Sequence, residues 1–200
     1  MTRILCAALL FAFSAAALAQ TPPPPVRVRG TVTKLENNVM TVKAPDGKMV
    51  DVKLADNFTV VGVSRAHIAD LGEGKYIGTT TLGERNGALS ALEVHIFPES
   101  MRGVGEGHYP WDLKPDSKMT NGNVAEVKAM GKDRMLTVKY KGGEQRVAVP
   151  ANAKIVMFEP AERNELKKGS HIFVVAQRQP DGSLSAARVN VGVKGTVPPM

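Results

Sequence analysis

Apolar and polar residues alternate along several short stretches of this chain, and a period of two is typical of half-buried β-strands. Val50, Val52 and Leu54 alternate with charged residues, and residues 136–140 (LTVKY) follow the same pattern. Similar stretches recur through residues 26–97 and 120–192. The pattern therefore predicts an all-β protein.

Glycines mark the places where these strands are expected to turn or bend. The pairs at 46–47 (Asp-Gly) and 142–143 (Gly-Gly) separate strand stretches, and such pairs supply the positive φ that a tight hairpin turn requires. In the stretches that begin at Gly30 and Gly122, two apolar positions are once three residues apart. This spacing after a glycine predicts a bend or a β-bulge.

Between the third and fourth strand stretches of each half, the pattern becomes briefly helical. Ser64 is a candidate N-cap, and Ile68 and Leu71 share one helical face. In the second half, Pro160 opens the corresponding segment and Leu166 is its apolar anchor. We expect a short helix at both places.

The two halves of the chain are similar in sequence. Residues 86–94 (NGALSALEV) match residues 181–189 (DGSLSAARV), and residues 40–43 (MTVK) match residues 136–139 (LTVK). Internal repeats of this kind indicate a duplicated architecture. The sequence therefore predicts a tandem repeat.

Each copy has the order of three strands, a short helix and two strands, which is the order of a five-stranded OB-type barrel. We expect two tandem five-stranded OB-like barrels, each with a short helix between strands 3 and 4. Repeat 1 is expected at residues 26–97 and repeat 2 at residues 120–192, joined by a linker at residues 98–119.

A series of motifs follows the same order in both copies: Gly-x-Val, Leu-Thr-Val, Val-x-Val, Leu-x-x-Gly and Asp-Gly-x-Leu-x-Ala-x-x-Val, with Met-Thr-Val and Asn-Gly as the variants in the first copy. The series resembles secreted bacterial OB-like modules grouped in a family of unknown function, whose relatives sometimes carry the name metal transporter permease. The resemblance implies an OB-like fold and export, and it implies no catalytic residue.

The first nineteen residues are typical of a secretory signal. A basic residue, Arg3, precedes an apolar run at residues 4–18, and Ala17-Leu18-Ala19 predicts cleavage after Ala19. A Pro-rich segment at residues 20–25 follows, and residues 193–200 form a C-terminal tail. We expect a periplasmic or secreted protein without a membrane-spanning segment after cleavage, and its mature chain lacks cysteine because Cys6 lies in the signal.

The linker gathers the residues with the richest chemistry. Glu106, His108 and Asp112 could supply one imidazole and two carboxylates to a divalent metal ion, although no common metal-binding spacing accompanies them. Tyr109 and Trp111 could stack on a sugar or another flat ligand, or could fill the seam between the two barrels. Both interpretations of the aromatic pair stay open on the sequence.

The net charge of +7 is concentrated in the second half, where residues 120–192 contain twelve basic and seven acidic residues. A basic face on the first three strands of repeat 2 could bind an anionic surface or polymer, or could be a solvated face that protects edge strands. Its residues are Lys128, Lys132, Arg134, Lys139, Lys141 and Arg146.

The sequence contains no recognisable catalytic motif, and Ser117, His108 and Asp112 are close in sequence without implying triad geometry. We therefore expect a non-enzymatic exported binding or scaffold protein without a cofactor. Expected partners are anionic polysaccharide, lipid headgroups or another envelope protein rather than nucleic acid, which needs stacking aromatics beside the charge. The alternative function is a periplasmic metal-binding accessory protein that uses the linker cluster.

Overall fold

The computed structural model describes residues 23–85 and 87–199, and in these residues it contains strands and 3-10 turns but no α-helix. The strands are β1 (Val26–Glu36), β2 (Val39–Lys43), β3 (Met49–Arg65), β4 (Tyr76–Arg85), β5 (Ala88–Ile96), β6 (Gly107–Pro110), β7 (Lys118–Met130), β8 (Asp133–Tyr140), β9 (Gly143–Val149), β10 (Lys154–Ala161), β11 (His171–Arg178) and β12 (Leu184–Gly192). The 3-10 turns are η1 (Ile68–Asp70), η2 (Glu99–Met101) and η3 (Arg163–Glu165). The all-β prediction is confirmed. The predicted signal peptide (residues 1–19) and Asn86, the first residue of the predicted repeat match at residues 86–94, lie outside the described residues.

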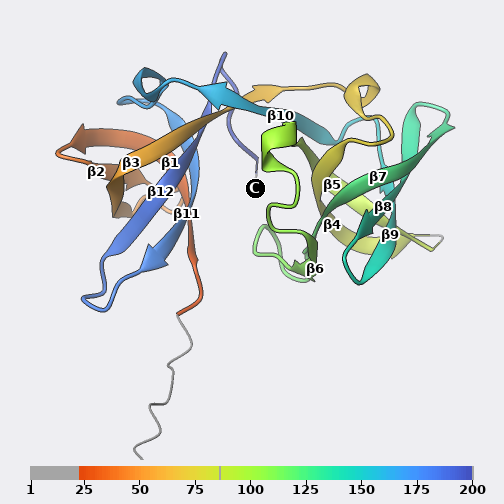
Figure 1. The fold of residues 1–200 in the computed structure, drawn as a ribbon, viewed down its shortest axis with the longest axis horizontal. Coiled ribbons are helices and arrows are strands. Elements are labelled where there is room, and N and C mark those ends of the chain that lie inside the picture. Colours follow the sequence, from red (N-terminus) through yellow and green to blue (C-terminus); the bar gives the residue numbers. More distant parts are fainter. Residues whose placement is uncertain (1–22, 86, 200) are drawn as a thin grey trace, which may run out of the picture.

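Five strands close into a barrel on one side of the molecule (Figure 1). β12, β11, β1, β2 and β3 pair in this order, and a parallel pairing between β12 and β3 closes the circle. Three of these strands come from residues 26–97 and two from residues 120–192. The barrel therefore does not coincide with either predicted repeat alone.

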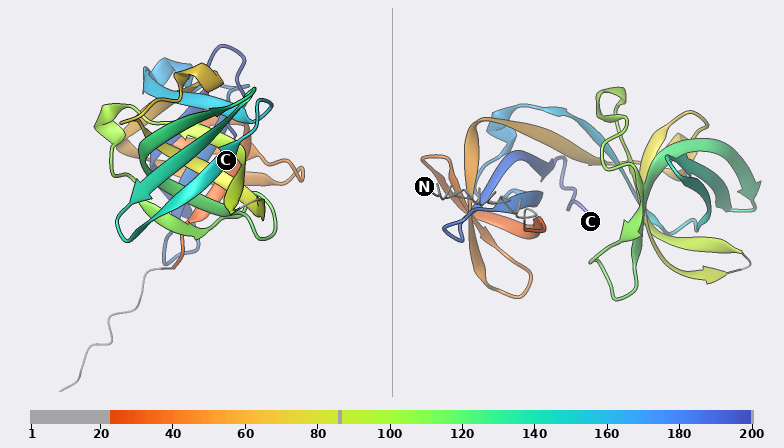
Figure 2. Two further views of the ribbon diagram at one scale, coloured as in Figure 1. Left: turned by 90° about the vertical axis from the view of Figure 1, so that its right-hand side faces the viewer. Right: turned by 60° about the horizontal axis from the view of Figure 1, so that its bottom comes forward.

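The strands β5, β4, β7, β8 and β9, which pair in this order, form what we call the second strand group. β5 also pairs in parallel with β9, at Leu89↔Val147 and Ser90↔Ala148. The short strand β6 lies along β7. The second strand group stands beside the barrel (Figure 2), and it also combines strands from both halves of the chain.

Two strands connect the barrel with the second strand group. β3 is 17 residues long; its first part pairs with β2 and its last part pairs antiparallel with β10, from Val60↔Ala161 to Arg65↔Val156. β10 in turn pairs in parallel with β5. The chain therefore leaves the barrel along β3 and returns to it along β10.

Backbone hydrogen bonds between the two halves are reciprocal. The N–H of Gly74, in the loop before β4, donates to the carbonyl of Val124 on β7 at 2.8 Å. The N–H of Gly169, in the loop before β11, donates to the carbonyl of Val32 on β1, also at 2.8 Å. Each half thus supplies two strands that pair with the first three strands of the other half.

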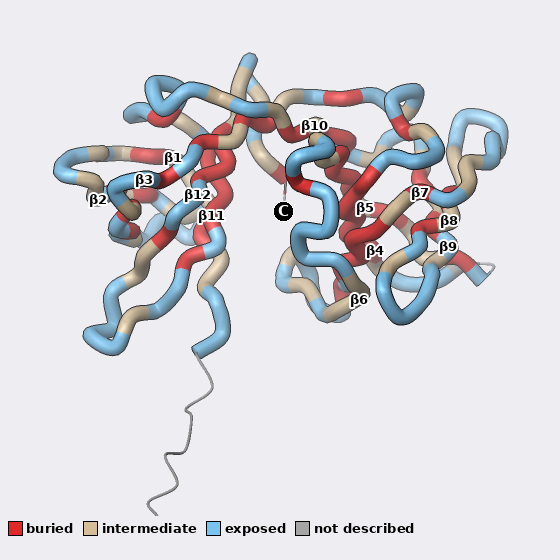
Figure 3. The backbone as a smooth tube through the Cα atoms, viewed as in Figure 1, coloured by how far each residue is buried: buried red, intermediate tan, exposed pale blue. Residues whose placement is uncertain are grey.

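In the part of the chain that the structure describes, buried side chains form three clusters. One fills the barrel around Met40, Val42 and Leu54, and another fills the second strand group around Leu136 and Val138. The backbone tube coloured by burial shows buried segments in both the barrel and the second strand group (Figure 3). The third cluster lies between them and consists of Val63, Met101, Val156, Phe158 and Phe173, with Val61, Phe97 and Trp111 packed against it.

The turns and bends follow the sequence predictions. Residues 46–47 separate β2 from β3, with positive φ at Gly47. The turn between β8 and β9 consists of Lys141 and Gly142, with positive φ at Gly142; it lies one residue earlier than predicted, because Gly143 already pairs with Tyr140 as the first residue of β9. The register shifts in the β1–β2 pairing between Val32 and Lys34, and in the β7–β8 pairing between Val124 and Glu126. The predicted hairpins and bulges are confirmed.

The two predicted helices are wrong, because each place has only a 3-10 turn of three residues, η1 or η3. Ser64 lies within β3 opposite Met157, and Pro160 lies within β10 opposite Val61. The antiparallel pairing of β3 with β10 holds these residues in extended conformation. Pairing with a distant strand therefore overrides the local helical pattern.

Candidate functional site

A cleft of about 1260 Å³ lies between the barrel and the second strand group. Its floor is the apolar cluster around Phe158, and its walls come from the outer face of β11 and β12 on one side and from β5, β7 and the linker on the other. Residues that line it include Arg27, His95, Phe97, Tyr109, Trp111, Asn121, Phe158, Phe173, Gln177, Ser185 and Asn190.

Aromatic rings pack against one another along the floor. The Phe158 ring on β10 stacks on the His95 ring of β5, with centroids 5.9 Å apart, and meets the Phe97 ring edge-on at 4.9 Å. The Trp111 ring lies between Phe173 on β11, at 6.4 Å, and Tyr109 on β6, at 6.2 Å. The floor thus combines rings from both sides of the molecule.

The linker is fixed to the second strand group by backbone hydrogen bonds. β6 pairs with β7, and the N–H of Trp111 donates to the carbonyl of Ser117 at 2.8 Å. The Ser117 hydroxyl donates to the carbonyls of Trp111 and Lys114 and accepts from the Lys114 N–H. Ser117 therefore stabilises the turn after Trp111.

Two arginines of β1 fix the same linker to the barrel. The Arg29 guanidinium donates to both oxygens of Asp112, at 2.7 and 3.1 Å. The Arg27 guanidinium lies 4.0 Å from the centroid of the Trp111 ring, and its Nε is 3.8 Å from Asp112 Oδ1. Val28 between them points into the barrel core, because neighbouring residues of a strand face opposite sides.

Four residues that line the cleft each have a buried polar atom without a hydrogen-bond partner. In the described part of the chain, the buried side-chain nitrogen and oxygen atoms without a partner are His95 Nε2, Trp111 Nε1, Asn121 Oδ1 and Asn190 Oδ1. All four residues line the cleft. A buried polar group without a partner costs roughly 1–3 kcal/mol, and the residues that carry these atoms all lie around one cleft.

His95 also has a buried acidic neighbour on β5, Glu93. Its Nε2 lies 3.2 Å from Glu93 Oε1, so the imidazole and the carboxylate are in direct polar contact. The Thr80 hydroxyl donates to the same carboxylate oxygen at 2.9 Å. Burial raises the pKa of Glu93, but His95, Thr80 and the charge of Arg29 together outweigh burial, so its pKa lies below the ordinary value.

The structure places the predicted aromatic pair, Tyr109 and Trp111, in the cleft. The Tyr109 hydroxyl donates to the carbonyl of Gly105 at 3.2 Å, and burial raises the pKa of this phenol. The Trp111 side chain is half-buried in the cluster between the two assemblies. Both residues can therefore support the linker and contact a ligand.

The predicted metal ligands do not converge. The Glu106 carboxylate accepts the backbone N–H of Lys141, His108 Nδ1 lies 2.8 Å from the Thr120 hydroxyl, and Asp112 binds Arg29. Burial, followed by the charge of Lys118, lowers the pKa of His108. Within residues 23–85 and 87–199, no group of three or more histidine, cysteine or acidic side chains is arranged for metal binding.

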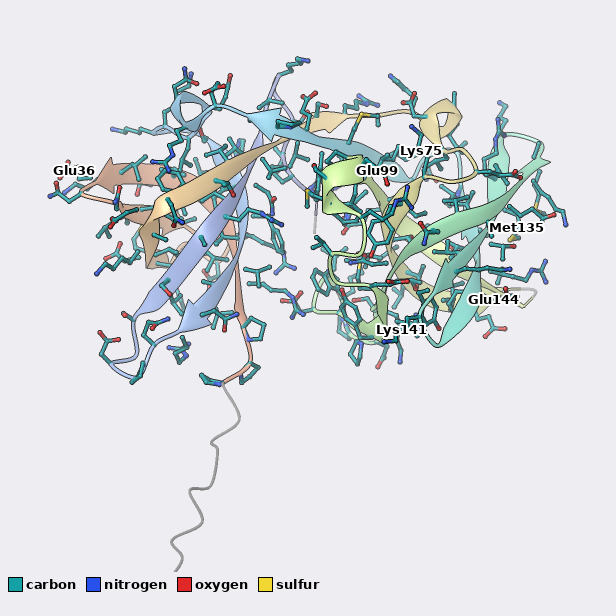
Figure 4. The ribbon with its side chains drawn as sticks, viewed as in Figure 1. Glu36, Lys75, Glu99, Met135, Lys141 and Glu144 are labelled. Carbon is teal, nitrogen blue, oxygen red and sulfur yellow. The ribbon has the colours of Figure 1, made fainter. Side chains whose placement is uncertain are left out.

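The predicted basic residues lie on β7, β8, β9 and their turns, and none of them lines the cleft. Lys128 Nζ is 2.8 Å from Glu126, and Lys139 Nζ is 3.9 Å from Glu144. Figure 4 shows Met135 and Glu144 of these strands on the side of the second strand group that faces away from the barrel. The other predicted basic residues are Lys132, Arg134, Lys141 and Arg146, and Arg134 lies on the opposite face of β8 from Lys139 because it shares the parity of the buried Leu136 and Val138.

The sequence did not identify His95, Asn121, Asn190 or Arg27 as site residues. A sequence pattern that could have identified such residues is a strand with apolar residues on both faces and an isolated polar residue among them. Residues 91–96 (ALEVHI) of β5 show this pattern. The pattern can be interpreted only if one knows that the outer face of such a strand is covered by the other part of the molecule, the barrel or the second strand group. That information lies in the pairing of β10 with β3 and β5, which no local pattern predicts.

Comparison with known proteins gives no relative for this chain: no protein-family model matches it, and neither the curated proteins nor the solved structures yield a match. No helix among the described residues has the length and the apolar character needed to cross a membrane.

Proposed function

We propose that this chain is a non-enzymatic binding protein that holds its ligand in the cleft between the barrel and the second strand group. The observation that carries the proposal is that Trp111, Asn121 and Asn190, three residues with a buried polar atom that has no hydrogen-bond partner, line one cleft with an aromatic floor. Ligand sites are typically concave and mostly apolar, with a few polar groups that fix orientation. The cleft has each of these properties.

The scaffold for this function is, in our proposal, a pair of OB-like barrels that exchange strands between two sequence repeats. The β5–β9 pairing would close the second strand group as the β3–β12 pairing closes the barrel. Equivalent glycines support the duplication: a Cβ at Gly30 would lie 2.1 Å from the Lys43 carbonyl oxygen, and one at Gly122 would lie 2.4 Å from that of Lys139. Both glycines allow a neighbouring strand to approach at the same point of the repeat.

Export to the periplasm or the cell exterior remains a prediction from residues 1–19. Binding of an anionic surface by the basic residues of β7–β9 also remains a prediction, and the proposed cleft does not depend on it. Binding to an immobilised anionic polymer that falls steeply with salt concentration would support that second surface.

The binding function is tested by thermal unfolding of residues 20–200 with three probe classes: neutral oligosaccharides, extended peptides and small organic anions. A ligand that binds the native state raises the melting temperature. The mature chain lacks cysteine, so Ala187→Cys can be labelled with a bulky maleimide to block the cleft that Ala187 lines.

Labelled Asn152→Cys, at an exposed turn outside the cleft, is the matched control. We expect at least one probe class to raise the melting temperature of the wild type and of the labelled control, but not of the protein with the blocked cleft. An unchanged melting temperature with all three classes, or an increase that survives blocking, contradicts the proposal.

A further inference from the structure

We infer that the ligand of the cleft is a neutral oligosaccharide, an inference that rests on the binding function proposed above. The unpartnered atoms require a ligand that both donates and accepts. Asn121 Oδ1 and Asn190 Oδ1 only accept, and the indole N–H of Trp111 only donates. A hydroxyl group does both, so a molecule with several hydroxyl groups can satisfy all of these atoms.

The apolar floor requires a second property of the ligand. Phe97, Phe158 and Phe173 pack there with Tyr109 and Trp111 at the side. A sugar ring has hydroxyl groups at its edge and C–H groups on its faces. It can therefore cover aromatic side chains while its edge reaches the amide and indole groups.

The charges around the cleft favour a neutral ligand. Glu93 lies beside His95 and Thr80 but does not line the cleft, and Arg27, which does, lies against Trp111 and Asp112. An anionic group on the floor would have only the Arg27 guanidinium as a counter-charge, and Asp112 already lies 3.8 Å from this guanidinium; burying a charge that is incompletely paired is costly. The other charged residues that line the cleft, Lys53, Asp181 and Arg188, are exposed at its rim.

The size of the cleft favours a ligand of more than one ring. Its volume of about 1260 Å³ exceeds the roughly 300–1,000 Å³ typical of sites for drug-sized molecules. An extended peptide is a less suitable ligand, because peptides commonly bind by adding a strand to a free sheet edge. Asn121 and Asn190 lie on β7 and β12, and both strands already have partners on both sides.

The test is isothermal titration calorimetry of residues 20–200 with cellotriose, maltotriose and tri-N-acetylchitotriose, together with an extended peptide of similar mass. We expect at least one of the trisaccharides to bind with a Kd below about 1 mM. Two conservative variants each remove one of the proposed contacts: Trp111→Phe keeps an aromatic ring without the N–H, and Asn190→Leu keeps the approximate volume without the carbonyl.

A hydrogen bond of roughly 0.5–1.5 kcal/mol corresponds to about a 2- to 12-fold change in affinity. We expect each variant to weaken trisaccharide binding by this factor, and Asn152→Leu, outside the cleft, to leave it unchanged. Replacing an unpartnered buried acceptor by an apolar group is close to neutral for stability. The ligand-free melting temperature of Asn190→Leu should therefore be no lower than that of the wild type, which separates weaker binding from misfolding.

The possible failures are distinguishable. Binding of the peptide without any of the sugars overturns the sugar inference and leaves the binding function in place. Sugar binding that neither variant weakens places the sugar outside the cleft and also overturns the inference. No binding of sugars, peptides or organic anions overturns both proposals.

Discussion

Gly122 on β7 packs directly against the backbone of β8. A Cβ at this position would lie 2.4 Å from the carbonyl oxygen of Lys139 and 3.0 Å from Val138 Cγ1. The neighbour is backbone, which cannot rotate away, so Gly122→Ala should overpack this point. We expect the free energy of unfolding to fall by roughly 1–3 kcal/mol, as measured by urea denaturation.

Gly72→Ala is the matched control for this substitution. A Cβ at Gly72 would meet nothing within 4 Å, and its φ lies outside the positive region. The expected change is within about 0.5 kcal/mol. Equal losses of stability in the two variants would mean that the close approach of β7 and β8 is not what Gly122 provides.

Single residues of the site differ in how far the sequence predicts them. Tyr109 and Trp111 stand out because aromatic residues are rare in this chain, at 5% of the total. His95 and Asn190 do not stand out, since a polar residue in a strand ordinarily faces water. They become buried only because each strand has one face on its own core and the other on the central cleft.

At the scale of elements, the linker is held from two sides. β6 pairs with β7 of the second strand group, and Arg29 of the barrel binds Asp112. A double-mutant cycle of Arg29→Ala and Asp112→Ala measures the coupling across this contact. We expect a coupling of about 0.2–1 kcal/mol that decreases with added salt, because the Asp112 side chain is 44% exposed.

Asp46 and Lys48 form an ion pair within one hairpin turn and provide the comparison. A cycle at this local pair should give a coupling near the lower end of the same range, because both side chains are more than half exposed. No measurable coupling between Arg29 and Asp112 at low salt would show that the linker is held by packing and backbone bonds alone.

The elements also show where a local pattern stops being informative. The alternation of Val50, Val52 and Leu54 predicts a strand, and these residues do lie in strand β3. The same sequence contains no sign that β3 continues to Arg65, because residues 64–71 have a plausible helical pattern. What extends the strand is β10, nearly a hundred residues later in the chain.

At the scale of the whole molecule, the pairing of strands from both halves of the chain couples the barrel to the second strand group. The barrel cannot unfold without releasing β11 and β12, which are connected through β10 to the second strand group. We therefore expect one cooperative unfolding transition, with far-UV circular dichroism and Trp111 fluorescence giving the same midpoint. Two independent tandem barrels would give two transitions.

Two core substitutions sharpen this test. Val42 lies in the barrel core and Val138 in the core of the second strand group, and both are 0% exposed. Val42→Ala and Val138→Ala should each lower the free energy of unfolding, measured from the single transition, by about 2 kcal/mol. A variant that splits the transition in two would show that the assemblies are thermodynamically separate despite their shared strands.

The pairing of early and late strands also sets the order in which the barrel and the second strand group can form during synthesis of the chain. β1, β2 and β3 are made first, yet their barrel closes only with β11 and β12, which are made last. The second strand group can pair as soon as β9 has been made. β2 is available to β1 and β3 at once, but the other edges of these two strands stay without their barrel partners for most of the elongation of the nascent chain. The first strands to leave the ribosome therefore wait longest for their second neighbours.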